Sequence, residues 1–254
     1  MLPSILLTND DGIQSTAFDA LDYALEALGR VTIVAPDREM SASSHSLTFN
    51  QPLRYHQWTP NRYAVQGTPA DCVILAVLKI MPPEKPALVI SGINRGANVG
   101  DDVAYSGTLA GAFEAALQGI PAIAVSTYAR VDPDYAPAAE LTARLAAKVL
   151  KDGLPPDVVL NVNFPREWNG EIRVTTQGRR SAKTVLVENL DPRGREYFWL
   201  HEESHKTPGA RELVPEVMSD YEALKSGYVS VSPLHLDRTA YAYVQRMAAW
   251  ISSL

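Results

Sequence analysis

Short, continuous apolar runs alternate with amphipathic segments over the first two-thirds of this 254-residue chain. Strands that show no apolar–polar alternation are buried on both faces, as in parallel sheets covered by helices. The sequence therefore predicts an α/β fold, Rossmann-like and doubly wound, with a mostly parallel sheet in residues 1–165. The predicted strands are residues 4–8, 30–36, 86–94, 121–127 and 157–165.

Helices are predicted between these strands at residues 16–29, 67–80 and 106–119. The first has apolar residues at helical spacing, which is typical of a helix packed on a sheet. The second begins with Thr68, which can cap it, and Asp71 stands at the capping-box position three residues later.

The pattern changes after residue 165, where β-type runs are separated by polar loops. Residues 166–254 are therefore predicted to form a β-rich C-terminal extension, either as a separate unit for oligomerisation or as a continuation of the same domain. Residues 202–215 are expected to form a long loop, and a terminal helix is expected after Asp237 as its cap. The predicted strands are residues 171–178, 184–189, 196–200 and 228–236.

Composition narrows the classes of partner and compartment. The net charge is −6, so no basic face is expected for stable nucleic-acid binding. The single cysteine, Cys72, excludes an internal disulfide framework and a cysteine-based zinc site, and we expect it in the core. No secretory leader or membrane span is recognisable, which predicts a cytoplasmic protein without a membrane partner.

Polar clusters follow three of the predicted strands, at residues 9–12, 35–48 and 91–108. In an open parallel sheet, ligands bind outside the carboxyl ends of the strands, so these clusters can meet at one edge. Carboxylates, amide carbonyls and hydroxyls are the ligands that hard divalent cations prefer. The candidate metal ligands are Asp10, Asp11, Ser41 and Asn94. The alternative for residues 9–12 is a simple turn, because Asn, Asp and Gly are common turn residues.

The third cluster also has the features of a phosphate site. Gly96 and Gly100 allow a close approach of the backbone, and Asn98 supplies a side-chain donor. A helix start offers free N–H groups and the positive end of its dipole to an anion. The candidate phosphate ligands are Asn98, Ser106, Gly107 and Thr108. The alternative for Ser106 is an ordinary helix cap.

Several other polar residues are weaker candidates. His45 is either a proton donor to a leaving group or an exposed, locally bonded histidine, and we favour the second interpretation. His235 is expected to be structural, and the pair Asp101–Asp102 to support or solvate a loop. Surface roles are favoured for Arg179, Arg180 and Lys183.

Five segments together resemble the stationary-phase survival protein family SurE, a family of metal-dependent nucleotide phosphatases. Their order along the chain is the family's order, and one local departure is Ala42, where many relatives carry glycine. The segments are "LLTNDDG", "VAPDREMSASSHSLT", "GTPADCV", "SGINRGANVGDDVAYSGTLAGAFEA" and "VSVSPLHLDRT".

The resemblance implies one divalent ion per subunit, Mg²⁺ or Mn²⁺ with Ca²⁺ as a possible occupant, on Asp10, Asp11, Ser41 and Asn94. It places the phosphate contacts on Asn98, Ser106, Gly107 and Thr108. It also implies hydrolysis of nucleoside 5′- and 3′-monophosphates, with short polyphosphate as a further substrate. A homodimer or homotetramer is implied, in which the C-terminal extension is exchanged between subunits.

The resulting hypothesis is a 5′-nucleotidase in which Asp10 and Asp11 are the catalytic residues. Two alternatives stay open: a nucleotide-binding regulatory module without turnover, and a transferase that uses a nucleotide donor. The dinucleotide fingerprint G-x-G-x-x-G does not follow the first strand, and no G-x-S-x-G nucleophile elbow follows a strand.

Overall fold

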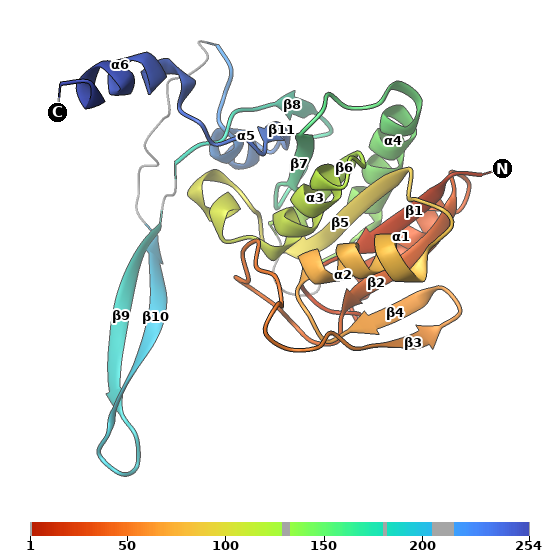
Figure 1. The fold of residues 1–254 in the computed structure, drawn as a ribbon, viewed down its shortest axis with the longest axis horizontal. Coiled ribbons are helices and arrows are strands. Elements are labelled where there is room, and N and C mark those ends of the chain that lie inside the picture. The colour runs from red at the N-terminus through yellow and green to blue at the C-terminus, as the bar shows by residue number, and fades with distance from the viewer. Residues whose placement is uncertain (1, 129–132, 180–181, 205–215, 254) are drawn as a thin grey trace.

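The computed structural model describes residues 2–128, 133–179, 182–204 and 216–253. Their main feature is a nine-stranded sheet in the order β3-β4-β2-β1-β5-β6-β7-β11-β8 (Figure 1). The six strands from β4 to β7 run parallel, as predicted for the α/β core. The strands are β1 (Ser4–Thr8), β2 (Arg30–Pro36), β3 (Tyr55–Thr59), β4 (Arg62–Val65), β5 (Leu88–Arg95), β6 (Ala122–Thr127), β7 (Val158–Phe164), β8 (Ile172–Val174) and β11 (Val229–His235).

The strand order places a topological switch point between β1 and β5. From β1 the chain moves first to β2 on one side and later to β5 on the other, and both neighbours pair with β1 in parallel. A crevice opens where the connections diverge in this way, and ligands of doubly wound sheets bind there. Asp10 and Asp11 follow β1, and Asn94 lies near the end of β5.

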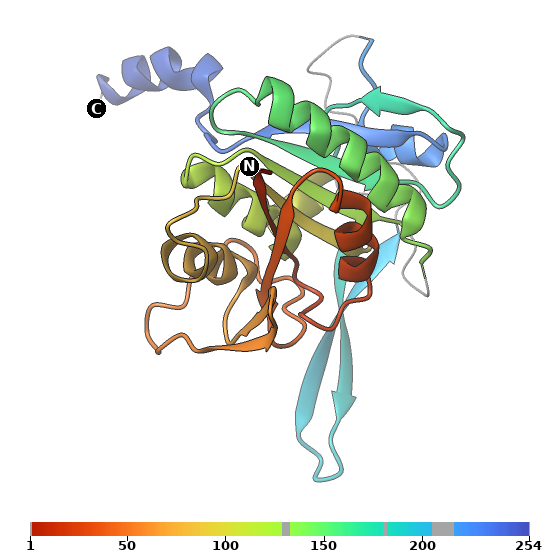
Figure 2. The same ribbon diagram turned by 90° about the vertical axis from the view of Figure 1, so that its right-hand side faces the viewer.

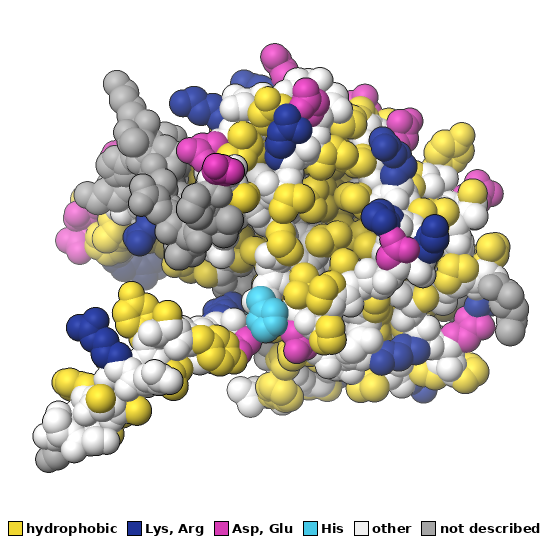
Figure 3. Space-filling model, turned by 90° about the horizontal axis from the view of Figure 1, so that it is seen from above, with side chains coloured by type: hydrophobic (Ala, Val, Ile, Leu, Met, Phe, Trp, Pro, Cys, Tyr) yellow, Lys and Arg dark blue, Asp and Glu magenta, His cyan; other side chains and the backbone are white. Residues whose placement is uncertain are grey.

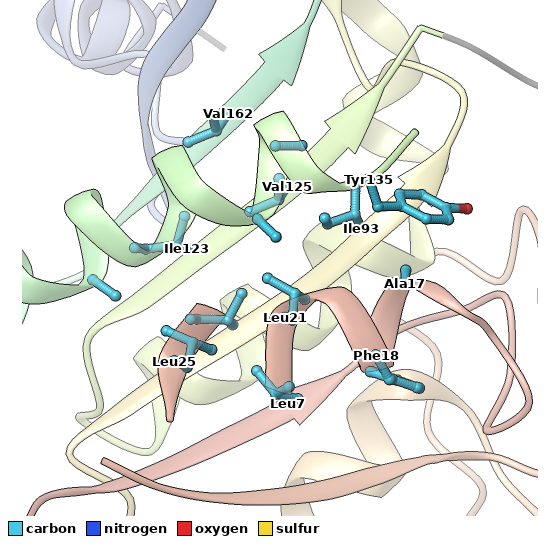
Figure 4. Packing of buried hydrophobic residues seen from close by; sticks show 14 of the residues in the cluster. Leu7, Ala17, Phe18, Leu21, Leu25, Ile93, Ile123, Val125, Tyr135 and Val162 are labelled. Carbon is cyan, nitrogen blue, oxygen red and sulfur yellow. The ribbon is translucent and has the colours of Figure 1, made fainter. Parts of the chain in front are cut away.

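Helices cover both faces of the sheet (Figures 1 and 2). On one face, Leu21 and Leu25 of α1 pack in the same cluster as Ile123 and Val125 of β6 (Figure 4). On the other face, Cys72 is fully buried in a second cluster, as expected for a core residue. The helices are α1 (Ala17–Leu25), α2 (Pro69–Leu75), the π-helix η1 (Ala76–Ile80), the 3₁₀-helix η2 (Gly100–Ala104), α3 (Gly107–Leu117), α4 (Ala136–Asp152), α5 (Asp220–Lys225) and α6 (Tyr241–Ile251).

The C-terminal extension is divided between the sheet and two projecting elements. Strand β11 pairs antiparallel with β7 and parallel with β8, so the main sheet continues past residue 165. Strands β9 (Ala182–Leu190) and β10 (Glu196–Ser204) pair with each other and extend from the body as a hairpin (Figures 1 and 2). Helix α6 also projects, and none of its residues is buried (Figure 3).

Two local predictions in this extension are wrong. Strand β10 extends to Ser204, so the expected loop cannot begin at residue 202; residues 205–215 lie outside the described residues. Asp237 does not cap α6, which begins at Tyr241 without a side-chain cap. Instead, Asp237 accepts the N–H of Thr239 at 2.8 Å and the hydroxyl proton of Tyr241. An aspartate that bonds its own backbone two residues on forms a turn rather than a cap.

The predicted cap of α2 is present, and it carries a tertiary contact as well. The Asp71 carboxylate accepts the N–H of Thr68 at 2.9 Å, while the Thr68 hydroxyl accepts the N–H of Asp71 at 3.2 Å. Asp71 also accepts the N–H and hydroxyl of Thr48, at 3.0 and 2.6 Å, and is 2% exposed. It therefore ties the loop after β2 to α2.

Asp71→Asn is expected to lower the free energy of unfolding by about 1–3 kcal/mol, because one amide oxygen cannot accept all three donors and a buried donor stays unpaired. Urea unfolding in chelator measures the change. The matched control is Glu222→Gln, which alters the exposed capping box of α5 and should cost below about 1 kcal/mol. Equal losses would contradict the tertiary role of Asp71.

Candidate active site

The loop after β1 is closed by hydrogen bonds between the Asn9 side chain and the Gly12 backbone. The Asn9 side chain accepts the N–H of Gly12 at 3.0 Å and donates to the Gly12 carbonyl at 3.2 Å. This closed turn matches the simple interpretation of Asn9 and Gly12 as turn residues. It leaves the carboxylates of Asp10 and Asp11 between them, at the carboxyl edge of the sheet.

Asp10 is a buried carboxylate that packs against the start of α3. It is 5% exposed, and its Oδ1 accepts the hydroxyl proton of Thr108 at 2.7 Å. Burial raises the pKa of Asp10 from 3.8 to about 6, against the hydrogen bond from Thr108, and the neighbouring Asp11 raises it further. The metal-free protein therefore holds Asp10 ionised at a cost.

Asp11 has one oxygen with a partner and one without. The guanidinium Nε of Arg95, at the end of β5, donates to Asp11 Oδ1 at 3.4 Å. Asp11 Oδ2 is buried and has no hydrogen-bond partner among the described residues. Burial raises the pKa of the Asp11 carboxyl, and the charge and hydrogen bonds of Arg95 oppose this shift. Burial and the Asp11 charge also raise the pKa of Tyr135, which lies beside Ile93 (Figure 4).

Gly107, the first residue of α3, shows how closely the site is packed. A Cβ atom at this position would lie 2.8 Å from Ser43 Oγ and 2.9 Å from Asp10 Oδ2. Ser43 Oγ is buried and has no partner among the described residues. The Ser43 hydroxyl, the free side of Asp10 and the start of α3 therefore converge, and only glycine fits between them.

Ser41 lies next to this point, although its side chain is turned elsewhere. Its exposed hydroxyl donates to Glu39 Oε1 at 2.6 Å. The preceding residue, Met40, donates its N–H to the Asp10 carbonyl at 2.7 Å. The backbone thus brings Ser41 to Asp10.

Asn94 is directed by an irregularity in β5. The register between β5 and β6 shifts between Ser91 and Asn94. Gly92 has φ +134° there, and a Cβ atom would lie 2.2 Å from the Val125 carbonyl oxygen, so glycine is required. The half-buried Asn94 side chain donates its Nδ2 to the Gly96 carbonyl at 2.8 Å. Its amide oxygen points away from that bond.

Asn98 is held from three sides in the interior. Its N–H donates to Asn163 Oδ1 at 2.7 Å, and its carbonyl accepts from Asn161 Nδ2 at 2.8 Å. Its Nδ2 donates to Ser126 Oγ at 2.8 Å and lies 3.5 Å from Thr108 Oγ1. Because Thr108 in turn bonds Asp10, a continuous polar chain joins β7, β6 and α3 to the first carboxylate.

The other helix-start candidates have partly structural roles. The Ser106 hydroxyl accepts the N–H of Leu109 at 3.1 Å, which makes it the N-cap of α3. The fully buried Thr108 hydroxyl donates to Asp10, so Thr108 itself can contact a ligand through its backbone alone.

The weaker candidates lie outside this cluster or outside the described residues. His45 Nε2 is 3.0 Å from Glu114 Oε2 in the middle of α3, a tertiary contact between a half-buried histidine and a buried carboxylate rather than the expected exposed or local bonding. His235 Nδ1 accepts the N–H of Asp237 at 3.0 Å, a structural contact. Asp101 and Asp102 lie in η2, and Arg179 is exposed. Arg180 and the side chain of Lys183 lie outside the described residues.

The donor set fits a hard divalent cation. Two adjacent carboxylates with raised pKa values and one unpartnered oxygen gain from a positive charge beside them. Serine and asparagine oxygens complete a set that suits Mg²⁺, Mn²⁺ or Ca²⁺ rather than a softer metal. Among the described residues, no group of three or more His, Cys, Asp or Glu side chains gathers as a metal site.

The mostly parallel sheet, covered by helices on both faces, with two adjacent carboxylates after β1 at its switch point, defines a Rossmann-like α/β protein. The model of the family "Survival protein SurE" matches residues 5–184. The chain belongs to the SurE family.

Relatives match over nearly the whole chain. A protein of Geotalea daltonii named 5′-nucleotidase SurE is 48% identical over 97% of this chain and 98% of its own length. A Pelobacter propionicus protein of the same name is 47% identical, with 97% and 99% covered. The crystal structure of the SurE protein from Aquifex aeolicus has a TM-score of 0.83 and 42% identity, and covers 98% of this chain and 99% of that one. No helix among the described residues is long and apolar enough to cross a membrane.

Sequence reasoning missed several residues that shape the site. Ser43 and Arg95 stand in the quoted motifs but differ in no visible way from surface residues; only the folded chain places them at Asp10 and Asp11. Asn161 and Asn163 did carry a signal, because two amides alternate with apolar residues in the buried strand β7. Buried amides require partners, and theirs is Asn98.

The raised pKa of Asp10 predicts that the metal-free site destabilises the fold. An acid with a folded-state pKa near 6 and an ordinary value of 3.8 keeps its proton in the folded state over that range, so stability falls as pH rises through it. In chelator at pH 8, Asp10→Asn should raise the free energy of unfolding by about 2–3 kcal/mol.

Urea unfolding at pH 8 and pH 4 measures this effect, and the gain should largely disappear at pH 4. Asp19→Asn is the control, because Asp19 is an exposed carboxylate bonded to Arg62. If Asp10→Asn instead lowers the free energy of unfolding at pH 8, burial of the ionised Asp10 carboxylate does not destabilise the metal-free protein, and the prediction is wrong.

Proposed function

We propose that this chain is a divalent-metal-dependent phosphomonoesterase that hydrolyses nucleoside 5′- and 3′-monophosphates to nucleoside and phosphate. The reaction class is supported by family membership and by full-length relatives named 5′-nucleotidase at 45–48% identity. The single structural observation that supports the metal requirement is the pair of carboxylates Asp10–Asp11, in which the buried Asp11 Oδ2 has no partner among the described residues.

The proposed metal ligands are Asp10, Asp11, Ser41 and Asn94, for one ion per subunit. A divalent ion held there supplies positive charge that neutralises and polarises the phosphoryl group. Asp11 can meet the ion through Oδ2 while Oδ1 keeps its contact with Arg95, whereas Ser41 has to turn from Glu39. Glu39 is exposed, so this change is inexpensive compared with moving a buried side chain.

The protein groups around the ion orient the reactants. The proposed phosphate contacts are the Asn98 side chain, which would have to exchange its bond to Ser126 for one to a phosphoryl oxygen, and the backbone at Ser106, Gly107 and Thr108. The helix dipole there favours the negative charge of the phosphoryl oxygens. A water close to Asp11 is aligned by the carboxylate and attacks phosphorus, the ester P–O bond breaks, and the nucleoside hydroxyl leaves with a proton. Charge spread over the phosphoryl oxygens is stabilised by these fixed dipoles.

The substrate range follows from where the contacts lie. All assigned contacts touch the phosphoryl group, and none of them reads the base or the sugar. A site of this kind accepts 5′- and 3′-phosphates alike, and short-chain polyphosphate presents the same terminal group. The competing proposal, a regulatory module that binds nucleotide without turnover, uses the same contacts and differs in releasing no phosphate.

Phosphate release from a panel of nucleoside monophosphates tests the reaction. Release should be absent in chelator and return with Mg²⁺ or Mn²⁺, and Asp10→Asn should lower kcat by at least about 100-fold, the effect of losing one electrostatic contact in an active site. Asp19→Asn should behave as wild type. Full metal-dependent activity in Asp10→Asn would refute the site, and tight nucleotide binding without release would favour the regulatory module.

The proposal includes a homodimer or homotetramer in which the C-terminal extension is exchanged between subunits. Large apolar side chains are exposed on the β9–β10 hairpin and on α6, which projects from the body (Figure 3), and surfaces of this kind mark protein interfaces. They are Leu186, Val187, Leu190, Tyr197, Phe198, Trp199 and Leu200 on the hairpin, and Tyr241, Tyr243, Val244, Met247, Trp250 and Ile251 on α6.

Trp199→Glu and Trp250→Glu are expected to lower the molar mass in solution by at least half, because a buried charge without a partner disrupts an apolar interface. Light scattering after size-exclusion chromatography measures the mass. Tyr23→Glu is the control, since Tyr23 is 83% exposed on α1, away from both elements. A monomeric wild type would contradict the proposal.

A further inference from the structure

The chain segments before and after the hairpin meet the site loop at one residue, Gly100. The segments on either side of the hairpin, residues 177–179 and 219–221, are called here the hairpin root. Asp220 Oδ2 accepts the Gly100 N–H at 2.8 Å. Gln177 Nε2 donates to the Gly100 carbonyl at 2.7 Å. Both backbone groups of Gly100 are thus bound by the root, one by each segment.

Asp220 also holds the two segments of the root together. Its Oδ1 accepts the N–H of Gly178 at 2.9 Å and of Tyr221 at 2.8 Å. Thr176 and Ser219 form a bridge beside it, in which the Asp220 N–H donates to the Thr176 carbonyl at 2.9 Å. Asp220 is fully buried. If its carboxylate were removed, the N–H groups of Gly100, Gly178 and Tyr221 would each lose an acceptor at a buried position where water does not readily replace it.

The contact leaves no room for the loop to shift. Gly100 has φ +57°, and a Cβ atom would lie 2.8 Å from Tyr221 Cε2 and 3.0 Å from the Arg179 carbonyl carbon. Glycine is needed here both for this conformation and for the close approach. The loop backbone therefore lies directly against the root.

Gly100 lies within the loop that presents the phosphate contacts. It follows Asn98 by two residues and begins η2, which leads to Ser106 and α3. Upstream, Asn98 is fixed by β6 and β7 through Ser126, Asn161 and Asn163. The root fixes the next point along the chain, between Asn98 and the start of the helix.

We propose that Asp220 and Gln177 are positioning residues for the phosphate loop, so that the hairpin root completes the active site from the C-terminal extension. The inference rests on the proposed phosphate contacts at Asn98 and at the start of α3. Neither residue touches the reacting atoms; each acts through the backbone of Gly100. The extension therefore contributes to catalysis as well as to assembly.

Three variants and one matched control test the proposal in the full-length, metal-loaded protein: Asp220→Ala, Asp220→Asn, Gln177→Ala and, as control, Glu222→Gln. Glu222 lies in the same helix, α5, and bonds Ser219, but has no bond to Gly100. The measurements are kcat and KM for a nucleoside 5′-monophosphate, the inhibition constant of inorganic phosphate, and the Mn²⁺ dissociation constant by calorimetry.

Asp220→Ala should lower kcat/KM by about 10- to 100-fold, the effect of removing a supporting hydrogen-bond partner. Inorganic phosphate should bind correspondingly more weakly, while the Mn²⁺ dissociation constant stays within about twofold, because the side chains of Asp220 and Gln177 bond the backbone of Gly100, Gly178 and Tyr221 rather than a proposed metal ligand. Asp220→Asn should recover part of the loss, because its amide oxygen still accepts from the backbone. Glu222→Gln should match wild type in all three measurements.

Wild-type kcat/KM in folded Asp220→Ala would overturn the proposal, as would an equal loss in Glu222→Gln. If Asp220→Ala does not fold, Gln177→Ala decides, because it removes a single bond from a half-buried side chain. Unchanged phosphate inhibition in Gln177→Ala would then overturn the proposal. If wild type hydrolyses no nucleotide, the proposed function fails, but weaker binding of inorganic phosphate in the variants would still support the positioning role.

Discussion

The buried carboxylate of Asp10 is the constraint on which the rest of the site depends. A charge removed from water must be stabilised by fixed dipoles, a counter-charge or a bound cation. Thr108 and the start of α3 provide the dipoles, which fixes where α3 begins relative to β1. The packing around Gly107 follows from the same requirement, because the helix must approach within contact distance of the Asp10 carboxylate.

The polar chain from Asp10 through Thr108 to Asn98 explains why β7 carries two asparagines in an apolar strand. Asn161 and Asn163 are fully buried, and a buried amide is tolerated when its groups are paired. Both side chains bond the backbone of Asn98, and they also bond each other. Two successive strands of the sheet, β6 and β7, therefore act as a rigid support for one loop, which is more precise than a loop that supports itself.

The sequence predicts much of the fold because the α/β core depends on local patterns. Continuous apolar runs and the Thr68–Asp71 capping box are visible in a few neighbouring residues, and each lies where predicted. Position at the carboxyl end of a strand made Asp10, Asp11 and Asn94 candidates, and the structure has them at the ends of β1 and β5. The contacts of Ser43 near Gly107 and of Arg95 with Asp11 form between segments that are far apart in the sequence, and no pattern of neighbouring residues predicts such contacts. Asp237 shows a second limit of local patterns. Aspartate is common both as a helix cap and in turns, and the conformation of the surrounding chain decides which of the two forms.

Strand β11 connects the strand that supports Asn98 with the helix that begins at Asp220. It pairs with β7 and follows α5. The C-terminal extension is therefore attached to the site loop through the sheet on one side and through Gly100 on the other. A displacement of the hairpin root cannot be absorbed by a soft connection, because both attachments are buried and hydrogen-bonded. The conformation of the loop around Gly100 therefore depends on the segments before and after the hairpin, through its bonds to Asp220 and Gln177.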